Sequence, residues 1–197
     1  MAILKLLTEV FVIYYLPVLL ILFNIIPFEF RFGMLVIITS ILIVYSLIRK
    51  KSLKSLGIRL DNLKQSLILN LSYSAIFVLL MLTLYYLNMI REPTLPKWSM
   101  FFLFYVFISS PSQEFLYRSY LFNLFDHYKI KSNYTRVLFS SFTYAFLHLI
   151  YLDFTTFLTP FLIGIGWGII YQKYPNLIGV SISHAILGVV SILVGLI

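Results

Sequence analysis

The sequence predicts an all-α integral membrane protein, a bundle of about seven transmembrane helices, and three observations lead to this fold class. The chain of 197 residues is 61% hydrophobic, and its mean hydropathy is +0.97. Only 11% of the residues are charged, whereas soluble domains carry about 25%. The apolar residues also form runs long enough to cross about 30 Å of hydrocarbon. Too few polar groups remain to cover a water-facing surface.

Seven apolar segments, each near the roughly 20 residues that a spanning helix needs, divide the chain. They are Val10–Phe28, Phe32–Ile48, Ser66–Ile90, Trp98–Phe125, Val137–Leu152, Phe154–Tyr171 and Leu177–Ile197. The fourth segment is the longest, and Pro111 within it predicts a kink because proline lacks a backbone N–H. The second and fifth are short, which requires tilting or local burial. We expect residues 1–197 to form one transmembrane domain, with the first segment retained rather than cleaved as a signal.

The basic residues predict the orientation of the bundle, because cytoplasmic loops are enriched in Lys and Arg. With the N-terminus inside, eleven of them fall on the inner side, namely Lys5, Arg49, Lys50, Lys51, Lys54, Arg59, Lys64, Lys129, Lys131, Arg136 and Lys173. Only Arg31, Arg91 and Lys97 fall on the outer side. The sequence therefore predicts an N-in, C-out, multi-pass protein of the cell membrane.

The composition also excludes several classes of function. The chain has no cysteine, which excludes a disulfide scaffold, thiol catalysis and a lipid anchor on cysteine. The net charge of +8 sits in short loops between apolar runs rather than on a face shared with exposed aromatic residues. This distribution favours contact with anionic lipid over nucleic acid, and we expect no nucleic-acid partner.

Ionisable residues inside three of the apolar segments are the candidate functional residues, because burying a charge in a bilayer is costly. Glu114 and Arg118 are four residues apart on one helical face, where the two charges can neutralise each other. His148 follows Tyr144 by one helical turn, and His184 lies in the last segment. If their helices pack together, a carboxylate and two imidazoles meet in one polar cavity.

Each of these residues also has a purely structural interpretation. A Glu–Arg pair can simply hold neighbouring helices together, and a single intramembrane histidine is more often a packing residue than a base. The repeated glycines Gly164, Gly166 and Gly168 are typical of close helix packing. The occurrence of Glu114, His148 and His184 on three different helices nevertheless favours a catalytic function. A carboxylate and a histidine polarise water, and a second histidine stabilises an oxyanion. No cofactor is required, although Glu114, His148 and His184 are also a donor set for a divalent metal such as zinc.

Three short motifs in these segments resemble the CAAX-protease and bacteriocin-processing family of intramembrane endopeptidases. The family carries Glu-Glu-x-x-x-Arg, then Phe-x-x-x-His, then His-x-x-x-Asn or Asp. This chain has Gln113-Glu114-Phe115-Leu116-Tyr117-Arg118, Tyr144-Ala145-Phe146-Leu147-His148 and His184-Ala185-Ile186-Leu187-Gly188. The motifs occur in the same order inside hydrophobic helices, and the resemblance covers residues 98–197.

The resemblance implies a peptidase in which a glutamate and a histidine activate water and a second histidine helps hold the oxyanion. Glu114 matches the second glutamate of the family motif, Arg118 its arginine, and His148 and His184 its two histidines. The implied partner is a peptide or protein substrate at the membrane, which we expect to be presented from the inner leaflet.

Two positions depart from the family pattern. Gln113 stands where the first glutamate belongs, and a neutral amide orients water but does not take its proton. Gly188 stands where the family has a side chain that helps hold the oxyanion. Three explanations follow: Glu114 serves as the base with His148, the chain is a non-catalytic relative, or Gln113 is an engineered inactivation.

The sequence thus leaves three functions open. The first is an intramembrane peptidase that uses water activated by glutamate and histidine. The second is a catalytically impaired relative that acts as a binding, immunity or scaffold protein. The third is a small proton-coupled transporter that relays protons through Glu114, His148 and His184.

Overall fold

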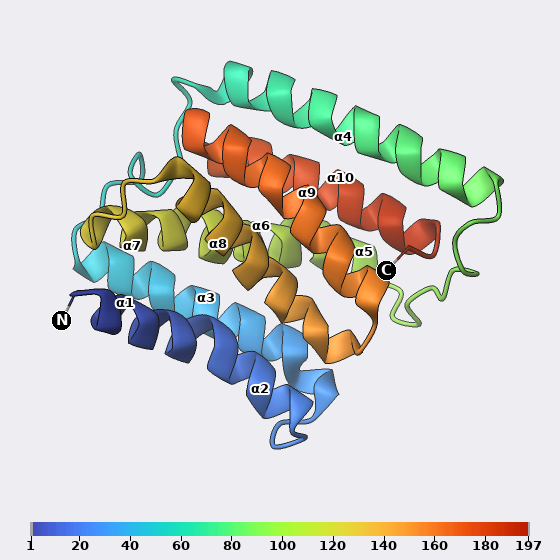
Figure 1. Cartoon of the computed structure of the whole chain (residues 1–197), viewed down its shortest axis with the longest axis horizontal. Coiled ribbons are helices and arrows are strands. Elements are labelled where there is room, and N and C mark those ends of the chain that lie inside the picture. Colours follow the sequence, from blue (N-terminus) through green and yellow to red (C-terminus); the bar gives the residue numbers. More distant parts are fainter. Residues whose placement is uncertain (1, 197) are drawn as a thin grey trace.

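The computed structural model describes residues 2–196, and every regular element in that range is a helix. The elements join into seven continuous helical rods (Figure 1). In chain order the rods are α1 (Ala2–Val10), η1 (Phe11–Tyr15) and α2 (Leu16–Leu22); η2 (Phe28–Phe30) and α3 (Arg31–Ile48); α4 (Leu63–Tyr86); α5 (Phe101–Phe104), η3 (Tyr105–Ser109), α6 (Ser110–Glu114), η4 (Phe115–Tyr120) and α7 (Leu121–His127); α8 (Asn133–Leu147) and η5 (His148–Tyr151); α9 (Phe154–Lys173); and α10 (Leu177–Leu193). The predicted all-α bundle is confirmed.

The first rod shows the largest shift from its predicted boundaries. The sequence predicts a helix from Val10, but the helix begins at Ala2 and ends at Leu22. The additional residues at its start include the charged Glu9. Its Oε1 accepts a hydrogen bond of 2.6 Å from the Tyr128 hydroxyl. The early end coincides with Asn24, whose φ of 56° places it in the left-handed region that asparagine tolerates better than most residues.

Four of the rods are individually long and apolar enough to cross a membrane. They are Ile3–Leu22, Phe28–Ile48, Leu63–Tyr86 and Phe154–Lys173, while Leu177–Leu193 is a shorter apolar helix. The helix from Phe101 to His127 is divided by two π-helical turns, and α8 is only 15 residues long.

The distribution of polarity is inverted relative to a soluble protein. Apolar side chains face outward on the peripheral helices: Leu79 is 68% exposed and Ile37 is 60% exposed. The interior holds buried polar groups as well as an apolar core, and Glu114 and Arg118 have no exposed surface at all. In water this arrangement would expose apolar side chains to solvent, whereas the hydrocarbon of a membrane suits such a surface. The chain is a multi-pass membrane protein.

The loops gather at two opposite ends of the bundle (Figure 1). One end carries the N-terminus and the loops that follow α3, α7 and α9, which are the loops with the predicted inner charges. The other end carries the loops that follow α2, α4 and η5. The direction of the bundle in a membrane stays a prediction from these charges.

The rod from Phe101 to His127 runs through the middle of the bundle and passes Pro111 without interruption. Two wide π turns flank α6, and the backbone at Phe104, Ser110 and Phe115 stays in the right-handed helical region. Proline cannot donate the usual backbone hydrogen bond, and the π turn just before it changes the local bonding pattern. Such turns are rare and frequently occur at functional sites.

The glycines of α9 let this helix approach its neighbours closely. A Cβ added at Gly164 would lie 3.3 Å from Ser141 Cα, and one at Gly168 would lie 3.1 Å from Val137, so both face α8. Gly166 faces Tyr73 of α4 instead. The sequence-based interpretation of this repeat as a packing motif agrees with these contacts, and the Gly164 contact places α9 directly against the polar centre.

We predict that Gly164→Leu destabilises the bundle, because the added side chain must displace the backbone of α8. The expected loss is about 1–3 kcal/mol, measured as a lower thermal unfolding midpoint in detergent. Gly33→Leu is the matched control, because no heavy atom lies within 4 Å of a Cβ at Gly33. Equal stability of the two variants would contradict the close packing of α8 and α9.

Candidate active site

A cavity of about 810 Å³ enters the bundle from the end that carries the α2–η2, α4–α5 and η5–α9 loops. Its inner wall includes Gln113 and His148, which the sequence singled out, and it also includes His184. Because these residues come from the central rod, from the end of α8 and from α10, the helices do bring three of the predicted site residues to one space.

Gln113 and Glu114 are adjacent in the chain but lie in different surroundings. Successive helical residues point about 100° apart, so the two side chains of this pair diverge. Gln113 lines the cavity, and its Nε2 donates a 3.0 Å hydrogen bond to Ser109 Oγ. Its Oε1 is buried and has no hydrogen-bond partner among the described residues.

Glu114 lies behind the cavity wall in a charged cluster. Its Oε1 is 2.6 Å from His184 Nδ1, and its Oε2 is 3.4 Å from Arg118 Nε. The side chains of Glu114 and Arg118 have no exposed surface, and His184 is 1% exposed. Glu114 therefore engages His184 directly, whereas the sequence had left open its use as a base together with His148.

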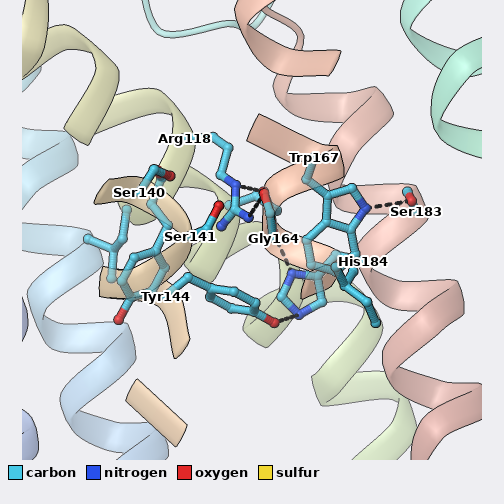
Figure 2. Close-up of polar contacts among 12 residues, drawn as sticks. Arg118, Ser140, Ser141, Tyr144, Gly164, Trp167, Ser183 and His184 are labelled. Atoms are coloured by element: carbon cyan, nitrogen blue, oxygen red, sulfur yellow. Dashed lines mark hydrogen bonds and ion pairs between the residues drawn. The ribbon is translucent and has the colours of Figure 1, made fainter. Parts of the chain in front are cut away.

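Arg118 is held by several groups besides the carboxylate. Its NH2 nitrogen donates a 3.2 Å hydrogen bond to the Gly164 carbonyl, which the absence of a side chain at Gly164 makes accessible. The guanidinium also lies 4.8 Å above the Tyr144 ring and 5.5 Å from the Trp167 ring. These aromatic faces favour the cation. Figure 2 shows Arg118 beside both rings.

Aromatic stacking and hydrogen bonds hold the His184 ring in place. The ring stacks on Trp167 with a centroid distance of 4.8 Å and an interplanar angle of 14°. Trp167 Nε1 donates a 2.8 Å hydrogen bond to Ser183 Oγ (Figure 2), and that oxygen is 2.7 Å from Ser74 Oγ. Helices α4, α9 and α10 thus fix the imidazole that Glu114 contacts.

His148 lies at the end of a helix rather than in the middle of one. Helix α8 ends at Leu147, His148 begins the short helical turn η5, and Leu152 closes that turn with a φ of 53°. His148 Nδ1 is 3.1 Å from the Tyr144 carbonyl oxygen. Because a carbonyl only accepts, Nδ1 carries the proton and Nε2 is an unprotonated nitrogen that can accept one.

Tyr144 connects the two histidines. Its hydroxyl is 3.4 Å from His184 Nε2 (Figure 2), and its ring meets the His148 ring edge-on with a centroid distance of 5.0 Å. Its backbone carbonyl fixes the His148 tautomer as well. The tyrosine that occupies the family's phenylalanine position thus contributes a hydroxyl that phenylalanine lacks.

The zinc alternative requires Glu114, His148 and His184 to point at one metal ion. Between residues 2 and 196, no group of three or more His, Cys, Asp or Glu side chains is placed to hold a metal. The geometry gives a reason, because Glu114 is already engaged by His184 and Arg118. The three side chains do not form a metal centre in this arrangement.

Two aromatic residues of the site escaped the sequence analysis. Trp167, between two glycines of the repeat, is not singled out there, although a tryptophan buried deep in a span departs from the usual interfacial position. Tyr105 lines the cavity beside Gly188. The sequence offers no signal for the contact between Tyr105 and Gly188, because this contact depends on how the central rod packs against α10.

The mouth of the cavity is charged. All three basic residues that the charge count assigns to the outer side, Arg31, Arg91 and Lys97, line it together with Asp153. Asp153 caps α9 by accepting hydrogen bonds from Thr156, and this contact, with Arg91 3.5 Å away, holds the pKa of Asp153 below its ordinary value. The charged mouth and the polar inner wall enclose an apolar middle, which includes Phe32, Leu147 and Leu187.

A comparison with protein families gives a match over the region that forms this site. Residues 95–190 match the family described as type II CAAX prenyl endopeptidase Rce1-like. No match was found among curated proteins, and none among solved structures. The matched region runs from the cavity mouth through the central rod to α10 and contains Gln113, Glu114, Arg118, His148 and His184. This match supports, over residues 95–190, the resemblance to the CAAX-type intramembrane proteases that the three motifs indicate.

Proposed function

We propose that the chain is an intramembrane peptidase that hydrolyses a peptide bond in the cavity, with His148 as the base. The observation that best supports this is the tautomer of His148, whose protonated Nδ1 faces the Tyr144 carbonyl and whose Nε2 is left to accept a proton. Gln113 lies in the same wall with an unpartnered amide oxygen. A water molecule bound between the two would be held and deprotonated at one place.

The proposed reaction then proceeds in two steps. His148 Nε2 takes a proton from the water as its oxygen attacks the peptide carbonyl carbon, which gives a tetrahedral intermediate with a negatively charged oxygen. The C–N bond then breaks, and the leaving amine takes the proton from His148. Gln113, in the same cavity wall, orients the water through its side-chain amide and does not itself change protonation.

In this proposal His184 stabilises the oxyanion and Glu114 supports it. The Glu114 carboxylate, 2.6 Å from Nδ1, holds the imidazole in place, and Arg118 offsets the charge of that carboxylate in the buried cluster. The stacked Trp167 fixes the plane of the ring, so its second nitrogen is oriented before substrate binds. Glu114 acts here through His184, which makes it a positioning residue.

The catalytically impaired alternative rests on the two departures from the family pattern, the neutral side chain of Gln113 and the missing side chain at Gly188. A protein that only binds peptide needs the cavity but not a base. The two possibilities differ in what His148 contributes: a peptidase needs its free nitrogen, and a binding protein does not. Turnover by the wild-type protein separates them.

The position of the cavity mouth and the distribution of basic residues together bear on the side of the membrane from which substrate enters. The cavity mouth lies at the end that carries Arg31, Arg91 and Lys97, the end that an N-in orientation places outside. The inner-leaflet substrate expected from the family resemblance is incompatible with that orientation. We propose that a membrane-associated peptide reaches the site from the outer side.

We predict that His148→Ala lowers kcat by at least about 10²-fold, the usual effect of removing a general base. Glu114→Gln, which keeps an oxygen near His184, is expected to lower kcat without unfolding the bundle. The measurement is cleavage of a fluorogenic peptide library by the purified protein in detergent or vesicles. His127→Ala serves as the control, because His127 is exposed at the end of α7. Cleavage that survives both site substitutions would place the chemistry elsewhere.

Position 113 gives a second prediction. Gln113→Leu is expected to lower kcat by about 10-fold, the equivalent of one lost hydrogen bond to the water. Gln113→Glu restores the family pattern and adds a second acceptor of protons, so we expect faster cleavage with a new acidic limb in the pH–rate profile. If Gln113→Glu cleaves peptides and the wild type does not, the chain is the catalytically impaired relative.

The absence of cysteine makes the side of access measurable by labelling. We predict that Lys97→Cys at the cavity mouth reacts with a membrane-impermeant maleimide in intact cells. Lys51→Cys, on the opposite loop, is expected to react only after permeabilisation. The reverse pattern would refute the outer location of the mouth.

A further inference from the structure

Gly188, the second departure from the family pattern, lies against Tyr105, a residue from another helix. Gly188 lies one helical turn beyond His184 on α10, where the family has an asparagine or aspartate. A Cβ built at Gly188 would overlap the hydroxyl oxygen and ring carbons of Tyr105. The space of the family's side chain is therefore filled, and the atom that fills it is a hydroxyl group.

We infer that the Tyr105 hydroxyl is a catalytic oxyanion donor that replaces the missing side chain at position 188. This inference rests on the proposed peptidase function and identifies a further residue for the same reaction. A phenol donates one hydrogen bond through its O–H, and tyrosine side chains are among the donors that form oxyanion holes.

The position of Tyr105 matches this role. Tyr105 and His184 both line the cavity, and their rings meet edge-on with a centroid distance of 6.0 Å. Gln113 and His148 line the same space. A peptide carbonyl attacked by the proposed water can therefore direct its oxygen toward the Tyr105 hydroxyl and the His184 imidazole while its carbon faces the base.

Local structure explains how the tyrosine reaches α10. Tyr105 begins the π turn η3, which ends at Ser109 just before α6. Phe101 stacks against the Tyr105 ring with a centroid distance of 5.9 Å and an interplanar angle of 24°. Only a glycine at position 188 leaves room for the hydroxyl, so the glycine and the tyrosine form a matched pair.

The first test is Tyr105→Phe, which removes the hydroxyl and keeps the ring. We expect kcat for peptide cleavage to fall by about 10²-fold, as when one oxyanion donor is lost, with KM and the thermal unfolding midpoint close to those of the wild type. Tyr134→Phe is the control, because Tyr134 is 84% exposed. A wild-type kcat in Tyr105→Phe would overturn the inference while leaving the peptidase proposal intact.

The second test exchanges the matched pair. Gly188→Asn alone is expected to lose activity and stability, because the new side chain collides with Tyr105. Tyr105→Ala with Gly188→Asn recreates the family's arrangement, and its kcat should exceed that of Tyr105→Ala alone by at least 10-fold. A double variant no faster than Tyr105→Ala contradicts the replacement. Absence of cleavage by the wild-type protein would overturn both this inference and the proposed function.

Discussion

The buried contact of Glu114 with Arg118 and His184 is the interaction on which the rest of the site depends. Moving an isolated charge out of water costs several kcal/mol even after relaxation, so each member of this cluster requires the others. Glu114 and Arg118 are fully buried on one helix, while His184 comes from α10 and the carbonyl that receives Arg118 comes from α9. Satisfying one carboxylate therefore brings three helices together, and the close approach at Gly164 follows from the same requirement.

Gln113 and Glu114 are adjacent on one helix but point in different directions, and they therefore have different roles. Glu114 has its charge neutralised inside the protein, whereas Gln113, one residue earlier, presents a neutral amide to the cavity. The group in the proposed mechanism that changes protonation is then an imidazole, and the carboxylate contributes by holding another imidazole in place. Such an arrangement keeps a permanent negative charge away from the place where an oxyanion forms, which lowers the electrostatic cost of the intermediate.

The sequence predicts the all-α class and the polar centre well, because both arise from strong contrasts in hydropathy. Glu114 and Arg118 stand out in an apolar run, and the histidines gain weight from their motif spacing. It does not predict that Glu114 contacts His184 rather than His148, since helical periodicity defines a face but not the neighbour that the face meets. The contact of Tyr105 with Gly188 is hidden for the same reason: it is a matter of shape between two helices distant in sequence.

The π turn at Tyr105–Ser109 has a consequence for comparing this chain with its relatives. A π turn holds one residue more than the α-helical turn that it replaces, so it acts as a one-residue insertion that does not break the helix. Residues before the turn are rotated by about 100° relative to an uninterrupted helix. A relative that lacks the extra residue would direct the position equivalent to Tyr105 away from α10, and a large side chain could then evolve at the position of Gly188.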